Sequence, residues 1–468
     1  MSRLSNKKVL VLNAPNVPFT DAALLIEPID VLTVATWIQS LGYQVIVRDL
    51  DKEQVRANNF DSVLDQCSPE LVVIPFDYHI PLYTGAAATE VLEIIRCCRA
   101  RKIAVVLGGR PANTYPEYFL IDQGVSIIVG EMESALEEIL PKIFNKCSLE
   151  SVVGLILKSA DKIVRTDSRR LLFDLNRLPI PDRSLLDIKK YIEVHSILSS
   201  RGCVEKCSFC PVHEFWGMWR RRSAQLVVDE IQYLVQEYGA KKILFLDDHA
   251  TVNTRRMREI SSEIISRGIS VRLGCLSTVR CADPATLALM QAAGFVWIHY
   301  GAEFADDAIL QKLNKNISCD QIERAITVTR ELGIRVRTSW IFDAPGADEI
   351  GLNKTCELIL RTEPDEIRAH FLALRACAPL HKTFADQNLS SITEQYIHAA
   401  ASHANPYGID RTLLEASTNS LTEQLVSRGY HSVQSAEQWG KLKLEQFDSA
   451  NSRFISFCPG RYGIGWGS

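Results

Sequence analysis

Three cysteines stand close together in the stretch RGCVEKCSFCP at positions 201–211. Three residues separate Cys203 from Cys207, and two residues separate Cys207 from Cys210. Cysteine thiolates are the usual ligands of iron–sulfur clusters, and a cubane cluster needs four ligands. Three thiols from one short loop would therefore leave one iron open to a ligand that the protein does not supply.

Two other kinds of chemistry remain open for this triplet. A structural zinc site is normally closed by a fourth Cys or His, and His213 stands three positions after Cys210. A redox pair of the C-x-x-C type would use Cys207 and Cys210 but would not require Cys203. The other ten of the 13 cysteines are scattered, and we expect most of them to be buried as small apolar side chains.

The segments around the triplet alternate strand-like and helical patterns, which predicts how the cysteines are positioned. Short apolar runs stand at residues 195–202, 242–248, 271–278, 296–303, 336–346 and 366–374, with helical patterns between them. Six such units in residues 191–385 predict a partial (βα)6 barrel of the TIM type, because a full eight-fold barrel needs about 250 residues. The cysteines would follow the first strand, at the carboxyl ends where such barrels place their sites.

Residues 1–150 show the same alternation ahead of the barrel. Five apolar runs, at 7–15, 43–51, 71–76, 103–109 and 125–131, are separated by helical patterns. This order predicts a doubly wound, parallel, Rossmann-like sheet, in which a ligand binds outside the carboxyl ends of the strands. The residues at those ends are the candidates for that site: Asn13, Pro15, Asp77, Gly108, Gly109, Arg110, Gly130 and Glu131. The alternative is that the glycines only form strand-to-helix turns.

Two further segments complete the predicted organisation. Residues 151–190 contain short strand-like pieces followed by Pro179 and Pro181, which are typical of an extended linker. Residues 386–449 are polar and show helical patterns, which predicts a mainly helical region over 386–468. This region ends in FISFCPGRYGIGWGS. Cys458 and Tyr462 are candidates for a place in the active site, and the alternative is a tail packed on the outside of the barrel. The predicted fold class is therefore α/β with a helical C-terminal region.

The cysteine triplet, with the aromatic Phe209 just before its last cysteine, resembles the signature of radical S-adenosylmethionine (SAM) enzymes. The stretches WRRRSAQLVVDEI, LFLDDH, HYGAEFADDAILQKLNK and RVRTSWIFDAPGADE resemble further segments of that family and follow in the family's order. The resemblance implies that the three cysteines hold a [4Fe-4S] cluster and that SAM chelates the fourth iron. It also implies an electron donor such as flavodoxin or ferredoxin, and reductive cleavage of SAM to a 5′-deoxyadenosyl radical.

The same resemblance implies roles for five residues in binding SAM. Phe209 would contact the adenine, and Asp247 and Asp248 would accept hydrogen bonds from the methionine ammonium, where the family often has a GGE motif. Glu303 would bind the ribose hydroxyls, and Arg337 would pair with the SAM carboxylate. The alternatives are helix N-caps for the aspartates and a surface ion pair for Arg337.

Residues 1–150 resemble the cobalamin-binding domain that precedes the barrel in many radical SAM enzymes. The likeness rests on the order of the runs and on the GGRP and GEMES turns that follow the fourth and fifth runs. One departure is that cobalamin domains with a histidine cobalt ligand carry D-x-H after the first strand and a glycine three residues later. Here Asp77 and His79 follow the third run, and position 82 is Leu. We therefore expect that His79 does not ligate cobalt.

The combined resemblance implies a cobalamin-dependent methyltransferase that acts on a small-molecule or natural-product intermediate. The alternative keeps the cluster and SAM but leaves the first domain empty, for a rearrangement or for transfer of the 3-amino-3-carboxypropyl group of SAM. A third hypothesis is a zinc-stabilised binding module. It is disfavoured because the sequence has no second cysteine pair and, with a net charge of -4, does not indicate a basic surface.

The composition indicates the setting in which this chemistry would take place. Of the 468 residues, 47% are hydrophobic and 23% are charged, and the net charge is -4. Such values are typical of globular proteins and disfavour nucleic acids and membranes as partners. The N-terminus lacks a small-residue cleavage site and the chain lacks a long apolar run, so we expect a cytoplasmic enzyme. The sequence does not identify the substrate or the oligomeric state.

Overall fold

The computed structural model describes residues 6–15, 26–76, 85–160, 162–169, 174–191, 194–385, 409–433 and 453–458. The chain divides into two compact units, which are described one at a time. The first comprises Met1–Lys190 and Ala385–Ile397, and the second comprises Tyr191–Phe384 and His398–Ser468. Among the residues described, no helix combines the length and the apolar character needed to cross a bilayer.

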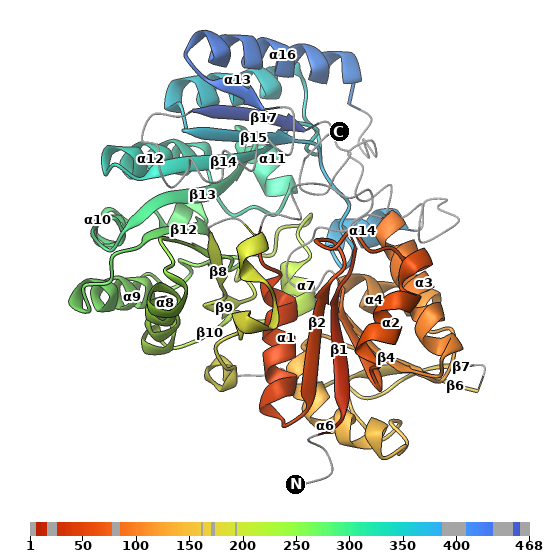
Figure 1. Cartoon of the computed structure of the whole chain (residues 1–468). Helices are drawn as coiled ribbons and strands as arrows, with labels where there is room; N and C mark the ends of the chain where they lie inside the picture. Colours follow the sequence, from red (N-terminus) through yellow and green to blue (C-terminus); the bar gives the residue numbers. More distant parts are fainter. Residues whose placement is uncertain are drawn as a thin grey trace. The chain divides into compact units, whose positions relative to one another are not determined.

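The first unit is built on a seven-stranded sheet of the order β2-β1-β3-β4-β5-β6-β7 (Figure 1). Strands β1 to β5 are parallel, as the five apolar runs predicted. Their side chains are largely buried, which explains why they read as continuous Val, Ile and Leu runs rather than as alternating patterns. The strands are β1 Lys8–Asn13, β2 Gln44–Asp49, β3 Leu71–Pro75, β4 Ala104–Gly108, β5 Val125–Ile128, β6 Leu155–Ser159 and β7 Lys162–Arg165.

Helices connect the parallel strands of this first sheet. Two of them, α1 and α6, pack against each other, while α3 packs against β4 and α5. The helices are α1 Ile29–Ser40, α2 Asp61–Cys67, α3 Gly85–Ala100, α4 Arg110–Thr114, α5 Pro116–Phe119 and α6 Met132–Phe144. The predicted Rossmann-like architecture of this part is therefore present.

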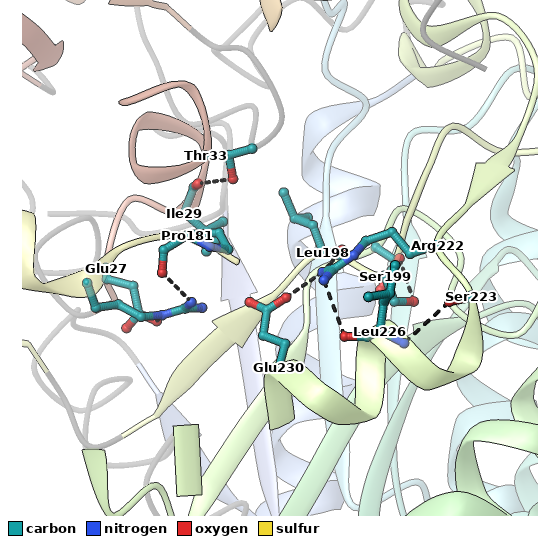
Figure 2. A network of polar contacts seen from close by, with 12 residues as sticks. Glu27, Ile29, Thr33, Pro181, Leu198, Ser199, Arg222, Ser223, Leu226 and Glu230 are labelled. Atoms are coloured by element: carbon teal, nitrogen blue, oxygen red, sulfur yellow. Dashed lines mark hydrogen bonds and ion pairs between the residues drawn. The ribbon is translucent and has the colours of Figure 1, made fainter. Parts of the chain in front are cut away.

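The segment that we expected to be a linker contributes to the sheet. Its strand-like pieces are β6 and β7, which continue the sheet from β5 in antiparallel fashion. The proline-containing stretch that follows is anchored on α1, because the backbone N–H of Asp182 donates to Thr36 Oγ1 at 2.7 Å. The buried Arg183 guanidinium lies 3.7 Å from the Glu27 carboxylate and donates to the Pro181 carbonyl at 2.9 Å (Figure 2). Residues 151–190 thus pack as part of the first unit.

The second unit carries an eight-stranded parallel sheet of the order β16-β17-β15-β14-β13-β12-β11-β8 (Figure 1). The six strands from β8 to β15 are those of the predicted partial barrel. In the described residues β8 and β16 form the two edges, so this barrel is open. The strands are β8 His195–Ile197, β11 Lys242–Phe245, β12 Arg272–Ser277, β13 Phe295–Glu303, β14 Arg335–Ile341, β15 Glu366–His370, β16 His431–Val433 and β17 Phe454–Cys458, with a separate pair β9 Ser200–Arg201 and β10 Arg220–Arg221.

A row of helices covers one face of the second sheet. Neighbours in the order α8, α9, α10, α12, α13 and α16 pack against each other along the row (Figure 1). Local signals fix their ends: Ser223 caps α8 by accepting from the N–H of Leu226, and α8 ends at Gly239 in the left-handed conformation. The helices are α7 Val212–Trp216, α8 Ala224–Tyr238, α9 Thr254–Ser266, α10 Pro284–Ala292, α11 Asp307–Lys312, α12 Cys319–Glu331, α13 Glu349–Thr362, α14 Pro379–Ala385 and α16 Arg411–Ser427.

Alternation along the strands separates an apolar face from a polar one. On β13 the side chains of Ile298 and Tyr300 join the apolar core that includes α12 residues such as Ile322. His299 and Gly301 therefore point to the opposite, inner face of the open barrel. The inner face is where polar side chains gather.

The described part of the C-terminal region combines the expected helix with two short strands. Its described part contains α16 but also β16 and β17, which extend the barrel sheet beyond β15. Phe454 and Ile455 of β17 are buried, so these apolar residues of the FISFC stretch belong to a strand that packs in the core. The backbone of Cys458 pairs in register with His370, at the carboxyl end of β15. Tyr462 lies outside the described residues.

Candidate active site

The three cysteines lie in the loop between β9 and α7, after the first barrel strand, as predicted. Cys207 is 6% exposed, and Cys203 and Cys210 are half-buried. The N–H of Cys210 donates to the carbonyl of Cys207 at 3.1 Å, which makes a tight turn between these two thiols. Phe209 in this turn packs against the barrel core. The loop therefore holds its thiols in fixed positions close to the carboxyl ends of the strands.

Distant parts of the chain brace this cysteine loop. The N–H of Ser208 donates to the carbonyl of Leu313 at 2.9 Å, and the amide of Asn314 donates to the carbonyl of Lys206 at 2.5 Å. The N–H of Leu380 donates to the carbonyl of Ser208 at 2.8 Å. The loop backbone is thus held at Lys206 and Ser208 although it belongs to no sheet or helix.

Two aspartates that follow the second barrel strand, Asp247 and Asp248, accept hydrogen bonds from residues at the start of the cysteine loop. Asp247 is fully buried, and its Oδ1 accepts from the hydroxyls of Ser199 at 3.0 Å and Ser200 at 2.6 Å. Asp248 Oδ2 accepts from the N–H of Gly202 at 3.2 Å. Burial raises the pKa of Asp247, and these hydroxyl bonds oppose the rise. The two aspartates therefore anchor the loop, and of the pair Asp248 has the more accessible carboxylate.

Two buried arginines hold the chain just ahead of the loop. Arg222 forms an ion pair with Glu230 and donates to the carbonyls of Leu198 and Leu226 (Figure 2). Arg256 Nη2 donates to the carbonyl of Ser199 at 2.9 Å. The WRRRSAQLVVDEI stretch thus carries a structural ion pair, which sequence reasoning did not identify. Paired charges around buried carbonyls make this segment rigid.

His249, the residue after the two aspartates, lies against a cysteine of the triplet. Its Nδ1 is 3.8 Å from the Sγ of Cys203, and the side chain is 3% exposed. Burial lowers the pKa of His249 to about 3, and the charges of Lys315 and Arg280 add to the effect, so the imidazole is neutral. The letters DDH gave no reason to single out this histidine.

Burial also dominates the electrostatics of the thiols. It raises the pKa of Cys203 to about 12, and the charge of Asp248 acts in the same direction. The pKa of Cys207 is likewise raised to about 12 by burial, which the positive charge of Lys315 opposes. Such thiols are poor nucleophiles by themselves and require a bound metal to become thiolates.

Glu303, at the end of β13, is held by a buried lysine. Its Oε1 accepts from Lys315 Nζ at 2.8 Å, and the two side chains are 7% and 10% exposed. Burial alone would lower the pKa of Lys315, but the charges of Glu303 and Cys207 outweigh it and raise that pKa. A Cβ at Gly301 would lie 2.4 Å from Glu303 Oε1, so a larger residue there would displace the Glu303 carboxylate. Glu303 itself has a φ of 65°, an uncommon conformation that aims its side chain.

Arg337, the other residue expected to contact SAM, has partners inside the barrel. Its Nε lies 2.7 Å from Glu366 Oε1, and its guanidinium stacks over the Trp297 ring at 4.7 Å. The role in binding the SAM carboxylate stays a prediction. His299 on the neighbouring strand shares a 2.7 Å hydrogen bond with Ser339, and burial together with the charge of Arg337 keeps its pKa well below the usual value.

The candidate residues of the first unit have local partners too. Asn13 Nδ2 donates to Asp49 Oδ1 at 2.8 Å, across the carboxyl ends of β1 and β2. A Cβ at Gly108 would lie 2.5 Å from Met132 Sδ, so a larger residue there would force the Met132 side chain to move. Pro15 closes the described stretch after β1, Gly109 and Gly130 have positive φ angles, and Arg110 and Glu131 are almost fully buried. Asp77 and His79 lie outside the described residues.

The donor set of the cysteine loop fits an iron–sulfur cluster. Within the described residues, no three His, Cys, Asp or Glu side chains converge on a point that could hold a single metal ion. Ligands of a cubane do not need to converge, because each cysteine binds a different iron. The zinc alternative with His213 as fourth ligand thus gains no support from the geometry. The functional residues missed by sequence reasoning are Lys315 and His249, which become visible only through their contacts with Glu303 and Cys203.

Comparison with known proteins agrees with this site. Residues 197–359 match the family model described as the radical SAM superfamily. A Pyrococcus horikoshii protein named an uncharacterized methyltransferase is 29% identical over 253 residues, which are 52% of this chain and 54% of that protein. The anaerobic magnesium-protoporphyrin IX monomethyl ester cyclase of Synechocystis is 23% identical over 430 residues, 86% of this chain and 83% of the cyclase. The chain thus spans about half the length of the first relative.

One solved structure is similar to this chain in fold. The radical SAM methyltransferase TsrM of Kitasatospora setae, solved with cobalamin and a [4Fe-4S] cluster bound, has a TM-score of 0.71 at 22% identity. The comparison covers 82% of this chain and 78% of TsrM. The expected resemblance is thus confirmed as a radical SAM domain in the middle of the chain and as a shared fold over most of its length.

Proposed function

Because residues 197–359 form a radical SAM domain, we propose that the protein is a radical SAM methyltransferase that uses cobalamin and acts on a small-molecule or natural-product intermediate. The observation that carries the proposal is the braced loop with its three buried or half-buried thiols at the carboxyl ends of the barrel strands. When bound, the cluster supplies the electron for cleaving SAM, and cobalamin supplies a carrier for the methyl group.

Cys203, Cys207 and Cys210 would hold three irons of the cluster. The loop reaches this arrangement through hydrogen bonds to backbone groups of the chain itself, for example between Ser208 and Leu313. The fold of the chain thus holds the loop that would carry the ligands. Preorganised ligands bind with less loss of conformational entropy than flexible ones.

Glu303 and Asp248 are the residues that we propose to orient SAM. Lys315 contacts Oε1 of Glu303, which leaves Oε2 to accept from a ribose hydroxyl. Gly202 contacts Oδ2 of Asp248, which leaves Oδ1 to accept from the methionine ammonium. Asp247 already accepts from two serine hydroxyls, so we assign it to anchoring the loop. The placement of Phe209 at the adenine, and of Arg337 at the carboxylate, remains part of the proposal.

The first unit is the proposed cobalamin site. Support comes from its parallel sheet, from the turns after β4 and β5, and from the fold shared with TsrM. The backbone at Gly109 and Gly130, both with positive φ, allows close approach of a flat ligand. Gly108, Arg110 and Glu131 would shape the turns from within, since packing and burial already account for them. In this proposal His79 is not the cobalt ligand.

The proposal includes an external low-potential electron donor, such as flavodoxin or ferredoxin, and a reducing cytoplasmic setting. All the cysteines whose side chains the structure describes are free thiols. The TsrM structure with tryptophan shows that a relative in fold takes a small molecule as substrate. The second candidate function is transfer or rearrangement without cobalamin. It is favoured by the local partners of the first-unit residues, which explain their identities without a ligand.

An anaerobic spectrum of the reconstituted protein tests the proposal. The chain is reconstituted with iron and sulfide, offered hydroxocobalamin and desalted, and its iron and corrin contents are measured. We expect about four irons per chain, which a cubane requires, together with corrin bands. Iron without corrin would favour the second function, and the broken C–S bond of SAM would then be identified from its products. A colourless protein with one zinc would overturn both functions.

A further inference from the structure

We propose that His249 donates a hydrogen bond from Nδ1–H to the Sγ of Cys203 in the cluster-bound enzyme and so raises the reduction potential of the cluster. His249 would act as a positioning residue, because it touches a ligand of the cluster and not the substrate. The inference rests on the proposed function, since it requires a cluster on Cys203.

The geometry of the contact supports this role. Nδ1 of His249 and Sγ of Cys203 are 3.8 Å apart, within the range of hydrogen bonds to sulfur. The backbone N–H of Glu205 donates to the same Sγ at 3.4 Å. Within the described residues the other ring nitrogen, Nε2, is buried and has no partner. The contact with Cys203 is therefore the hydrogen bond that the fold gives to this imidazole.

The placement of His249 is enforced by both of its neighbours along the chain. On one side Asp248 is bonded to the N–H of Gly202, the residue just before Cys203. On the other side the N–H of Ala250 donates to the carbonyl of Leu276 in β12 at 3.0 Å. Asp248 is held through its carboxylate and Ala250 through its backbone N–H, and the His249 ring is 3% exposed, so His249 has little freedom to turn away from the sulfur.

The chemistry of the bound state determines the direction of the bond. A cysteine that ligates iron is a thiolate and can only accept, so the neutral imidazole must carry its proton on Nδ1 to make the bond. The proton stays on nitrogen throughout. Reduction adds one electron, taken from a low-potential donor, and increases the negative charge on the sulfurs. Hydrogen bonds to the sulfurs stabilise that charge and raise the potential.

Four proteins test the inference in the absence of SAM: wild type, His249→Phe, His249→Asn and His195→Asn. Phe removes the donor while keeping a flat ring, and the amide of Asn keeps a donor near the position of Nδ1. His195 begins β8, at the amino-terminal end of a strand in the same unit, and serves as the control. Each reconstituted protein is titrated anaerobically with a reduced viologen mediator, and the reduced cluster is followed by electron paramagnetic resonance.

We expect His249→Phe to lower the ratio of reduced to oxidised cluster about tenfold at a fixed solution potential, a shift of about 59 mV for a one-electron couple. His249→Asn should recover most of the difference, and His195→Asn should match wild type. Equal potentials in wild type and His249→Phe would overturn the inference while leaving the proposed function intact. Failure of wild type to assemble a cluster would instead overturn the proposed function.

A second measurement does not depend on the folding of the Phe variant. Wild-type protein labelled with 15N-histidine is reduced, and pulsed electron paramagnetic resonance records weak couplings of nitrogen to the cluster. The inference requires a histidine coupling in wild type that disappears in His249→Asn. A wild-type spectrum without such a coupling would contradict it.

Discussion

At the scale of single residues, the pair of Lys315 and Glu303 is the clearest case of a site residue whose partner determines its chemistry. The two side chains are nearly buried and 2.8 Å apart. Removing one member of such a pair leaves an uncompensated charge in a poorly solvated place, which typically costs about 3–5 kcal/mol. Removing both members together costs much less.

We therefore expect Lys315→Met to lower the free energy of unfolding of the apoprotein by about 3 kcal/mol or more, because Glu303 keeps a buried charge. The double variant Lys315→Met with Glu303→Gln should be markedly more stable than Lys315→Met alone. Urea unfolding of the apoproteins at neutral pH measures both effects. A double variant that is less stable than Lys315→Met would show that the pair is not coupled in this way.

Asp343, after β14, gives a prediction about pH. Burial raises its pKa to about 7, although the N–H of Leu372 donates to its carboxylate. The ordinary value is 3.8, so the folded protein binds this proton more tightly than the unfolded chain does. The stability that protonated Asp343 contributes is therefore complete below about pH 4 and is lost as the pH rises to about 7.

Asp343→Asn should flatten this pH dependence, because an amide keeps the acceptor for Leu372 and does not titrate. Wild type should lose thermal stability between pH 5.5 and 8.5 by more than Asp343→Asn does. Melting temperatures of the two apoproteins at both pH values measure the difference, and all other titrating groups cancel in the comparison. Identical losses in the two proteins would contradict the raised pKa.

At the scale of secondary-structure elements, the sequence predicted the parallel strands well and their extensions poorly. Runs such as LVVIPF are buried on both faces and carry a strong local pattern. The strands β6 and β7 appear in the sequence as strand-like pieces, but only their pairing from β5 onward shows that they continue the sheet. The strands β16 and β17 follow a long polar stretch, and only their pairing onto β15 identifies them. Pairing between distant segments leaves little trace in local sequence.

The site residues likewise fall into those that the sequence indicated and those that only the structure identifies. The cysteine triplet could be proposed from its spacing, and Asp248 and Glu303 from the resemblance to radical SAM enzymes. The contact of Lys315 with Glu303, and that of His249 with Cys203, depend on side-chain directions after the strands have been aligned. The anchoring role of Asp247 could not be predicted either, because its serine partners stand 47 and 48 positions away in the chain.

Strand β17 also yields a prediction. Phe454 and Ile455 are nearly fully buried, and burying such side chains contributes roughly 1.5–3 kcal/mol each. A chain ended after Val433 would lose β17 and leave β15 as an exposed edge, which invites aggregation. We expect it to melt at a lower temperature and to aggregate more than a chain ended after Cys458. Equal melting temperatures would mean that β17 adds nothing to the sheet.

At the scale of the whole molecule, the two units divide the proposed cofactors between them. The three thiols of the proposed cluster site belong to the second unit, and the proposed cobalamin site belongs to the first. Each unit has its own sheet and its own buried residues. Cofactor binding by one unit can therefore be measured in a variant whose other unit cannot bind its cofactor.

The variant with Cys203, Cys207 and Cys210 all changed to Ala should lose its iron and keep its corrin. The iron should fall from about four per chain to near zero, because no thiol ligands remain. The corrin bands after desalting should match those of wild type, since no residue of the first unit is altered. Iron and visible absorbance on the same sample measure both. Unchanged iron content would refute the assignment of the ligands.

The bracing of the cysteine loop has a consequence for how the protein is made in the cell. Ser208 is held by Leu313 and Leu380, which the ribosome adds long after the last cysteine of the triplet. The nascent chain therefore exposes its three thiols well before the loop can take its final shape. We therefore expect iron and sulfide to be delivered after residue 380 has been synthesised, by machinery that recognises the folded barrel and not the emerging peptide.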